Sequence, residues 1–532
     1  MKTKVIDNFK GTMTQYVDGD LNSGLSYVVN TFGYDPFTKP GNLTWCNASS
    51  RIDSGGTIIT DLIMCGKERV ESGILYVYAV GHLGRVYKIQ VNRPSTNDPN
   101  YDNAVLLTTI TTGTPTFTRG GFITFFGSTE QIYIGHDKGV TELNFDGTGE
   151  SVVGVAGSWT ATVPRPLKQF LGKLYAGNGK NLTEITDGGT VATYAKLSPS
   201  FPDNTQVRDL DVSPDGTYLQ AVVSELLLPD ITVTTQDTTP IAASKSFIFK
   251  WNGTDNGYTS FNTFPSFSLT ANTLFGDNQY TFGYDQFGAA VYAPTEKKYT
   301  LQEVQSTMPN AIASTGNMVM WMAPLYYDGF METDFLIAGT QDFEVGPGFW
   351  DLFAQFGTDT ETDIILTPFM MPVSNFGFGA SSNGYTNNIF GASKIYFSTF
   401  ETSSTTSDFK LFKWQMPSSP SVPASTPLLG AIYQTQNQLF SKKVQVKEIR
   451  VYAEPWVTNN SFRIDLIGSS GAVITNGSQT LTAGTSLTVG DDFAWYNPAT
   501  APTYSLGFWI ENLGTANFTI NKIEFDYVEG GK

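Results

Sequence analysis

Runs of apolar and β-branched residues alternate with short Gly- or Asp-containing turns along the first three quarters of the chain. Six copies of this pattern follow one another, and they begin at Ile74, Gln131, Lys173 and Arg208 and, more loosely, near Asn272 and Lys394. Such runs favour strands, and the short turns favour hairpins. The copies recur about every 50 residues, within the range of four-stranded propeller blades. The spacing between Tyr76 and Tyr396 predicts about seven blades.

We therefore predict an all-β fold with a β-propeller over residues 56–425. The segment Ser213-Pro214-Asp215-Gly216 fits a sharp reversal between two strands, because Pro fixes φ and Gly supplies the left-handed position. Residues 224–272 and 300–390 depart from the repeat, and we predict that they are insertions. The second of these is rich in Met and aromatic residues, which indicates a buried blade strand, a subunit interface, or both.

Residues 1–55 do not match the repeat and are predicted to form an extended N-terminal docking arm. The arm is rich in turn residues but also carries spaced aromatic residues, which a disordered tail would lack. We expect it to pack on its own chain or on a neighbouring subunit. The candidate subunit-docking residues are Phe9, Tyr16, Tyr27, Phe32, Tyr34 and Trp45 in the arm, with Trp321 and Trp350 in the second insertion.

The end of the chain has a different pattern. Prolines among serines between Met416 and Pro427 favour an extended spacer, and we place the linker at residues 426–439. Residues 440–532 alternate apolar and polar positions, which predicts a C-terminal β-sandwich of the jelly-roll or immunoglobulin-like type. Its candidate glycan-stacking residues are Trp456, Trp495 and Trp509, although residues of this kind more often belong to a core.

Composition restricts the possible functions. The 532-residue chain carries a formal net charge of -17 and only nine Arg, which disfavours a nucleic-acid grip. An acidic wall would instead repel phosphate and let DNA pass without binding. No 18-residue apolar run predicts a transmembrane helix, and the N-terminus lacks the apolar segment of a signal peptide. Cys46 and Cys65 could pair, but we interpret them as two buried thiols.

The candidate chemistry is sparse. His82 and His136 each follow a Gly in a predicted turn, where they could bind a metal or act as acid and base; equivalent positions in successive blades explain them equally well. The acidic groups Asp18 with Asp20, and Asp359 with Glu361 and Asp363, lack EF-hand spacing and are interpreted as solvated turns. The sequence shows no Ser nucleophile elbow, HExxH motif or phosphate loop. We expect no catalytic residue, metal or cofactor.

The order of arm, divergent propeller and added β-domain resembles the β-propeller nozzle or muzzle proteins of short-tailed bacteriophages. The residues that carry this resemblance are Phe9-Lys10-Gly11, Asn30 and Lys39-Pro40-Gly41-Asn42-Leu43. The single compact C-terminal sandwich departs from the family, whose inserted domains can be larger.

The resemblance implies a non-enzymatic virion protein of the tail or neck. Copies would form a cyclic ring around the DNA exit channel, contact other tail or neck proteins, and let DNA pass without specific binding during genome ejection. Two alternatives stay open. The first is a carbohydrate-binding receptor or adhesion protein that uses the C-terminal sandwich, and the second is a propeller glycosidase with two carboxylates across the scissile bond.

Overall fold

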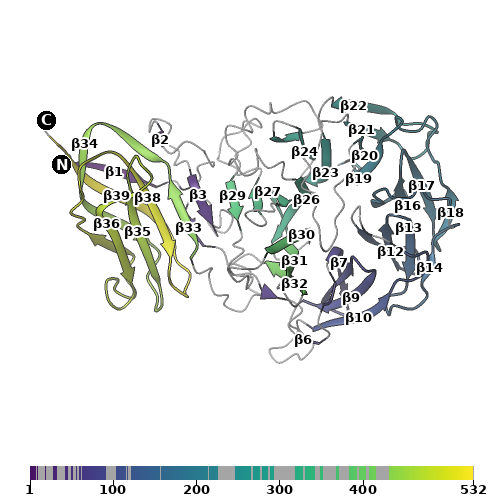
Figure 1. Ribbon diagram of the computed structural model, residues 1–532, viewed down its shortest axis with the longest axis horizontal. Coiled ribbons are helices and arrows are strands. Elements are labelled where there is room, and N and C mark those ends of the chain that lie inside the picture. The colour runs from purple at the N-terminus through teal and green to yellow at the C-terminus, as the bar shows by residue number, and fades with distance from the viewer. Residues whose placement is uncertain are drawn as a thin grey trace.

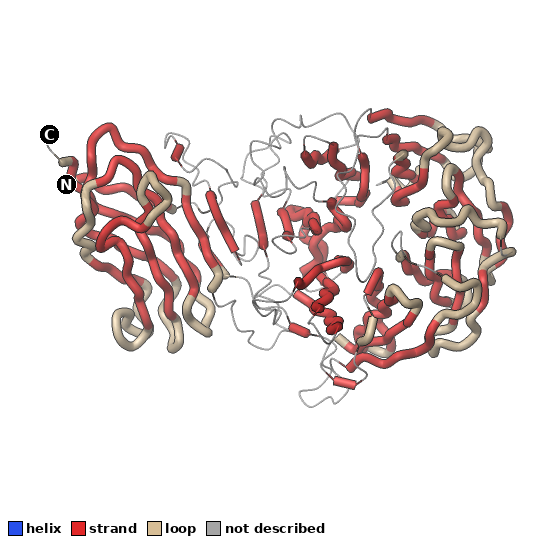
Figure 2. Tube along the Cα trace, in the orientation of Figure 1, coloured by secondary structure: helices blue, strands red, loops and turns tan. Residues whose placement is uncertain are grey.

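The computed structural model describes residues 1–7, 63–91, 103–115, 121–155, 157–213, 215–225, 246–264 and 430–530, with isolated residues and short strands elsewhere. Between residues 262 and 414 it describes the backbone of the strands only. Every regular element of the described residues is a strand (Figure 2). The strands form two lobes, with a propeller at the right of Figure 1 and a sandwich at the left.

The first four blades are antiparallel sheets whose strands follow chain order from the hub outwards. Blade 1 contains β7 (Ile63–Glu71), β8 (Ile74–Gly81), β9 (Arg85–Gln90) and β10 (Asn103–Thr109). Blade 2 contains β11 (Phe122–Phe126), β12 (Gln131–His136), β13 (Gly139–Leu143) and β14 (Ser151–Val152). Blade 3 contains β15 (Leu167–Phe170), β16 (Lys173–Asn178), β17 (Asn181–Thr186) and β18 (Thr190–Thr193). Blade 4 contains β19 (Gln206–Val212), β20 (Leu219–Ser224), β21 (Ser246–Trp251) and β22 (Ser260–Phe264).

Three more sheets continue the series. Blade 5 contains β23 (Ser268–Phe275), β24 (Asn278–Asp285) and β25 (Gly288–Tyr292). Blade 6 contains β26 (Met318–Tyr327), β27 (Phe330–Gln341), β28 (Gly348–Asp351) and β29 (Thr367–Met370). Blade 7 contains β30 (Asn383–Gly391), β31 (Ile395–Thr402) and β32 (Ser407–Trp414). The first strand of each blade contacts the first strand of the next, and β30 contacts β7, so the seven blades form a closed ring. The prediction of an all-β propeller with about seven blades is confirmed.

A strand from the N-terminal region completes the last blade. β5 (Ser50–Arg51) pairs antiparallel with β32 and supplies the fourth strand of blade 7. β6 (Gly55–Gly56) pairs in parallel with β10 at the outer edge of blade 1. The two short strands β5 and β6 therefore connect the last blade to the first blade and help to close the ring.

Both predicted insertions contain blade strands, which corrects the sequence interpretation. The segment 224–272 includes β21 and β22 of blade 4, and the segment 300–390 includes all four strands of blade 6. These strands escaped the repeat pattern because they are irregular. β26 shows two register shifts against β27 and contains Pro324, which breaks the apolar and polar alternation that marks the earlier blades.

The second lobe is a β-sandwich whose strands form one sheet folded into two layers (Figure 1). The first layer contains β34 (Asn437–Ala453), β37 (Phe493–Tyr496), β39 (Thr519–Glu529) and β1 (Lys2–Ile6). The second layer contains β33 (Ile432–Thr435), β35 (Ser461–Ile467), β36 (Val473–Thr482), β38 (Thr503–Asn512) and β3 (Val28–Phe32). β34 also pairs with β38 and joins the layers. The predicted C-terminal sandwich is confirmed.

Strands of the predicted arm are part of this sandwich. β1 pairs with β39, and β3 pairs with β33. β2 (Asp18–Gly19) pairs with β34, and β4 (Leu43–Thr44) pairs with β39. The predicted linker at 426–439 contains the whole of β33 and the start of β34, so the sandwich begins earlier than position 440. The described strands before residue 45 thus pack on their own chain.

The core between the two layers draws on both ends of the chain. Ile6, Phe9, Leu43 and Trp45 join one buried cluster with residues from Ala431 to Tyr527. The Trp45 ring meets the Phe518 ring edge-on at 5.9 Å between centroids. The Tyr433 hydroxyl donates a hydrogen bond to the Phe9 carbonyl over 3.1 Å. The described residues of the N-terminal segment are therefore an integral part of the sandwich core.

Candidate functional site

The two histidines lie at the same place in blades 1 and 2, where the second strand of the blade ends. Gly81 and His82 follow one another at the end of β8, and Gly135 and His136 do so at the end of β12. Blade 3 has Gly177 and Asn178 at the end of β16. A Cβ on Gly135 would lie 2.2 Å from the Arg165 carbonyl oxygen, so only glycine fits where this strand meets the neighbouring loop.

His136 is a structural residue of this turn. Its Nε2 lies 3.1 Å from the Thr141 hydroxyl, and its ring packs edge-on against Phe117. Burial, together with the nearby charge of Arg165, lowers the pKa of His136 to about 4. The ring is therefore neutral at pH 7. Among the described residues, no three His, Cys, Asp or Glu side chains gather as metal ligands would.

Arg165 locks blade 2 to blade 3 from the loop before β15. The buried guanidinium donates to the Gly177 carbonyl at 3.0 Å, to Asn178 Oδ1 at 2.8 Å and to the Thr160 carbonyl at 2.5 Å. It also lies over the Trp159 ring at 4.9 Å. Burial lowers the pKa of Arg165 to about 9, because water is replaced by neutral acceptors. Both terminal nitrogens of the guanidinium donate to these acceptors, so Arg165 acts as a clamp.

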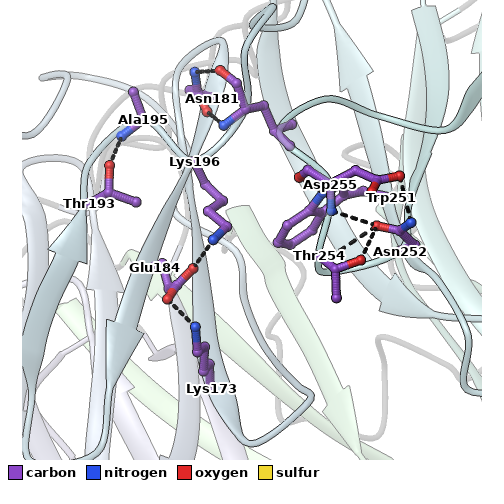
Figure 3. A network of polar contacts seen from close by, with 11 residues as sticks. Lys173, Asn181, Glu184, Thr193, Ala195, Lys196, Trp251, Asn252, Thr254 and Asp255 are labelled. Atoms are coloured by element: carbon purple, nitrogen blue, oxygen red, sulfur yellow. Dashed lines mark hydrogen bonds and ion pairs between the residues drawn. The ribbon is translucent and has the colours of Figure 1, made fainter.

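A second polar network lies at the boundary of blades 3 and 4 (Figure 3). Glu184 on β17 lies between the ammonium groups of Lys173 on β16 and Lys196, which lies 2.6 Å away. Lys196 also lies over the Trp251 ring at the end of β21, 5.7 Å from its centroid. Burial raises the pKa of Glu184, but the hydrogen bonds from Lys173 and Lys196 outweigh it and hold that pKa below its usual value. The ionised carboxylate thus holds Lys196 in place beside Trp251 of the next blade.

The innermost strands of the seven blades carry balanced charge. Their basic residues are Lys67, Arg69, Lys168 and Arg208, and their acidic residues are Glu68, Glu71, Asp209 and Asp211. Lys67 donates to Thr124 Oγ1 at 3.0 Å, and Lys168 pairs with Asp211 at 2.5 Å. Burial lowers the pKa of Lys67, and the nearby Lys168 lowers it further. The acidity of the whole chain is therefore not concentrated in these strands.

The candidate docking residues of the arm divide into two groups. Phe9 and Trp45 are fully buried in the sandwich core, so their side chains do not form an exposed docking surface. Tyr16, Tyr27 and Tyr34 lie outside the described residues, and for Phe32, Trp321 and Trp350 only the backbone is described. Cys65 is a buried free thiol, and Cys46 lies outside the described residues.

The three candidate glycan-stacking residues have different environments. Trp456 is fully buried and stacks on Phe462 with 5.5 Å between centroids, so it is a core residue and cannot reach a ligand. Trp509 on β38 is half-buried. Trp495 on β37 is 57% exposed. Only Trp495 has the accessibility that stacking on a sugar requires.

Trp495 stands beside a polar array on the outer face of the first sandwich layer. Strand pairing places Val5, Glu524, Arg450 and Trp495 in one row across four strands. The guanidinium of Arg450 pairs with three carboxylates, which belong to Glu448 at 2.9 Å, Glu524 at 3.3 Å and Asp526 at 2.9 Å. We call Trp495, Arg450, Tyr452, Lys522 and these three carboxylates the Trp495 face.

The second row of this face continues the array. The Tyr452 hydroxyl donates to Glu524 over 3.0 Å, and Lys522 pairs with Glu524 over 2.8 Å. Lys522 also lies 4.0 Å above the Tyr452 ring. Hydrogen bonds from Lys522 and Tyr452 lower the pKa of Glu524, and hydrogen bonds from Thr3 and Arg450 lower the pKa of Asp526. Both carboxylates are ionised acceptors at neutral pH. Sequence reasoning found the tryptophan but missed the charged residues, although they alternate with core residues along β34 and β39.

Comparison with known proteins identifies no family for this chain. No family model matches the chain, and no curated protein matches it. One similar solved structure is the Pan2 WD40 domain of Neurospora crassa, with 9% identity, a TM-score of 0.36, and coverage of 68% of this chain and 90% of that chain. Another is BBS1N in complex with ARL6DN, soaked with lead, with 8% identity, a TM-score of 0.40, and coverage of 70% and 97%. Likeness at this level says nothing about what this chain binds.

Within the part of the chain that the structure describes, no helix has the length and apolarity needed to cross a bilayer.

Proposed function

We propose that this chain is a non-enzymatic structural protein of a tailed-phage virion, located in the tail or neck in a nozzle-like assembly. The observation that carries this proposal is the way in which the N-terminal segment ties the lobes together. Its strands complete the sandwich, supply the fourth strand of blade 7 and extend blade 1. A chain whose two lobes share one continuous segment resists their separation, as a component under mechanical load must.

The two lobes suit repeated docking. A closed propeller has short, protected edges, so its surfaces can contact neighbours without inviting strand addition. β1 lies at one edge of the sandwich and carries Lys2 and Lys4, and such charged edge residues discourage extension of the sheet. Identical subunits that meet head to tail close into rings. We therefore propose that copies of this chain form a cyclic ring with other tail or neck proteins around the DNA exit channel.

Charge supports a passive relation to DNA. The net charge of -17 repels phosphate at long range, so the chain offers DNA no overall positive attraction. DNA would pass through the ring during genome ejection without being held. In a gel-shift measurement at low salt, the purified protein is expected to leave double-stranded DNA unshifted.

Electron microscopy of the purified full chain tests the proposal. We expect discrete rings of uniform symmetry, and antibody labelling of virions at a single vertex. As a control, the same preparation is incubated with capsular polysaccharide, where we expect no release of sugars. Monodisperse single particles at all concentrations, without labelled virions, would contradict the virion role, and sugar release would favour a propeller glycosidase.

A further inference from the structure

We propose that the Trp495 face is a binding site for neutral carbohydrate. The proposal is independent of the virion role, because it depends only on the outer face of the sandwich. Trp495 lies on β37 at the end of the Arg450 row, and the residue is more than half exposed. A flat aromatic ring next to a few fixed polar groups is the usual make-up of a small-ligand site.

The geometry of the strands places the polar groups at the level of the ring. Arg450 lies directly across from Trp495 in the pairing of β34 with β37, and Glu524 lies across from Arg450 in the pairing of β34 with β39. One face of a pyranose carries C–H groups that pack on an aromatic ring, whereas its hydroxyls need donors and acceptors at the ring edge. Trp495 supplies the platform, and the adjacent row supplies both kinds of partner.

These polar groups are already ordered. Arg450 is held by three carboxylates at 2.9 to 3.3 Å. Glu524 also accepts a hydrogen bond from the Tyr452 hydroxyl and forms an ion pair with Lys522. Side chains that are fixed before binding lose little conformational entropy when a ligand arrives. Hydrogen bonds from hydroxyls to ionised carboxylates are also stronger than those between neutral groups. The array is therefore preorganised for hydroxyl recognition.

The charge of the face selects the class of sugar. Its members include the three carboxylates of Glu448, Glu524 and Asp526 but only two cations, Arg450 and Lys522. An excess of negative charge repels sialic and uronic acids. We therefore assign neutral hexose or N-acetylhexosamine oligomers as the ligand.

Binding of the full chain to immobilised oligosaccharides tests the assignment. The probes are oligomers of glucose, galactose, mannose and N-acetylglucosamine, with sialylated and uronic-acid oligomers for comparison. We expect retention of at least one neutral series and none of the acidic ones. For the best neutral hexasaccharide, calorimetric titration is expected to show about tenfold weaker affinity in Trp495→Ala, because the stacking platform is lost.

Two further variants separate stacking from folding. Trp495→Tyr keeps an aromatic ring and is expected to retain most of the affinity. Tyr504→Ala removes another exposed aromatic side chain of the same sandwich, 53% exposed at the start of β38 and outside the Trp495 face, and is expected to change the affinity by less than about twofold. Equal losses in Trp495→Ala and Tyr504→Ala would overturn the assignment.

The failure of this proposal can be told apart from failure of the virion role. A wild-type chain that forms rings but retains none of the neutral oligosaccharides removes the carbohydrate site and leaves the virion proposal standing. If Trp495→Ala abolishes ring formation and no sugar binds, the Trp495 face is an interface between copies of this chain, and the carbohydrate assignment is wrong.

Discussion

The two lobes bury their apolar residues in different ways. The described propeller has several separate clusters, three of which join neighbouring blades, such as the one that joins Phe170 of blade 3 to Trp251 of blade 4. The sandwich has one large cluster built from both ends of the chain. Tyr433 and Phe9, which bond within it, are 424 positions apart. Propeller cores thus form between segments close in sequence, whereas the sandwich core requires the two termini to meet.

This difference predicts which parts of each lobe lose stability when a buried residue is substituted. Loss of one seam in the propeller is expected to weaken two blades and the ring closure, because each blade packs mainly on its neighbours. Loss of an N-terminal core residue is expected to weaken the whole sandwich. The sandwich has a single close-packed core, and no other residue fills the cavity that the lost side chain leaves.

The largest effect is expected for Trp45→Ala. Trp45 is fully buried against Phe518, so its removal leaves a large cavity in the sandwich core. We expect a loss of about 3–5 kcal/mol in the unfolding free energy of the sandwich. Guanidinium unfolding followed by circular dichroism measures it, with the exposed Trp495→Ala as the matched control, expected within about 0.5 kcal/mol. Similar midpoints for the two variants would mean that the N-terminal segment is not part of the core.

His136→Asn is expected to remove a pH dependence from the propeller. The pKa of His136 is about 4 in the folded chain, against 6.5 as its ordinary value. Between these values the unfolded chain binds the proton and the folded chain does not, so stability falls as the pH is lowered from about 6.5 to about 4. The wild-type loss over this interval is expected to be about 3 kcal/mol from this residue alone.

Asparagine is a suitable replacement because blade 3 carries Asn178 at the equivalent position. Unfolding is measured at pH 7 and at pH 4.5 for both proteins. The variant is expected to lose less stability than the wild type between the two conditions. Identical losses would show that His136 can be protonated in the folded chain.

Glu184→Gln tests the seam between blades 3 and 4. The amide keeps the shape but removes the charge that Lys173 and Lys196 share, and we expect a loss of about 1–2 kcal/mol. Glu142→Gln is the matched control in blade 2, since Glu142 accepts the Tyr133 hydroxyl at 3.0 Å and an amide oxygen can still accept it. Thermal unfolding compares the two, and a larger loss in the control would contradict the proposed clamp.

The smallest effect is expected for Lys180→Ala. Lys180 and Asp203 form an exposed pair at 2.5 Å, which solvent and salt screen. We expect a change below about 0.5 kcal/mol. Thermal unfolding at low and high salt measures it. A loss as large as that of Glu184→Gln would show that exposed ion pairs, and not buried ones, hold the blades together.

Much of the fold could be predicted from local pattern. The copies that begin at Ile74, Gln131 and Lys173 correspond to the second and third strands of blades 1 to 3, and the copy at Arg208 corresponds to the first and second strands of blade 4. Blade 6 could not be recognised, because its bulges and Pro324 disturb the alternation. The Trp495 face could be predicted only in part, because the ion pairs of Arg450 with Glu524 and Asp526 depend on the register of β34 against β39.

Alternation and turn residues by themselves specified hairpins, their approximate number and a sandwich at the end of the chain, because these are local preferences of neighbouring residues. Which distant strands meet was decided only in three dimensions. Ser50 and Arg51 carry no local signal of a strand, yet their backbone completes blade 7. Lys2 to Ile6 read as the start of a docking arm, yet they form the edge of the sandwich. The hydrogen bonds that hold such segments come from the backbone, which is the same in every non-proline residue, so the sequence of the segment does not reveal them. The segment instead pairs where the rest of the fold leaves a strand edge without a partner.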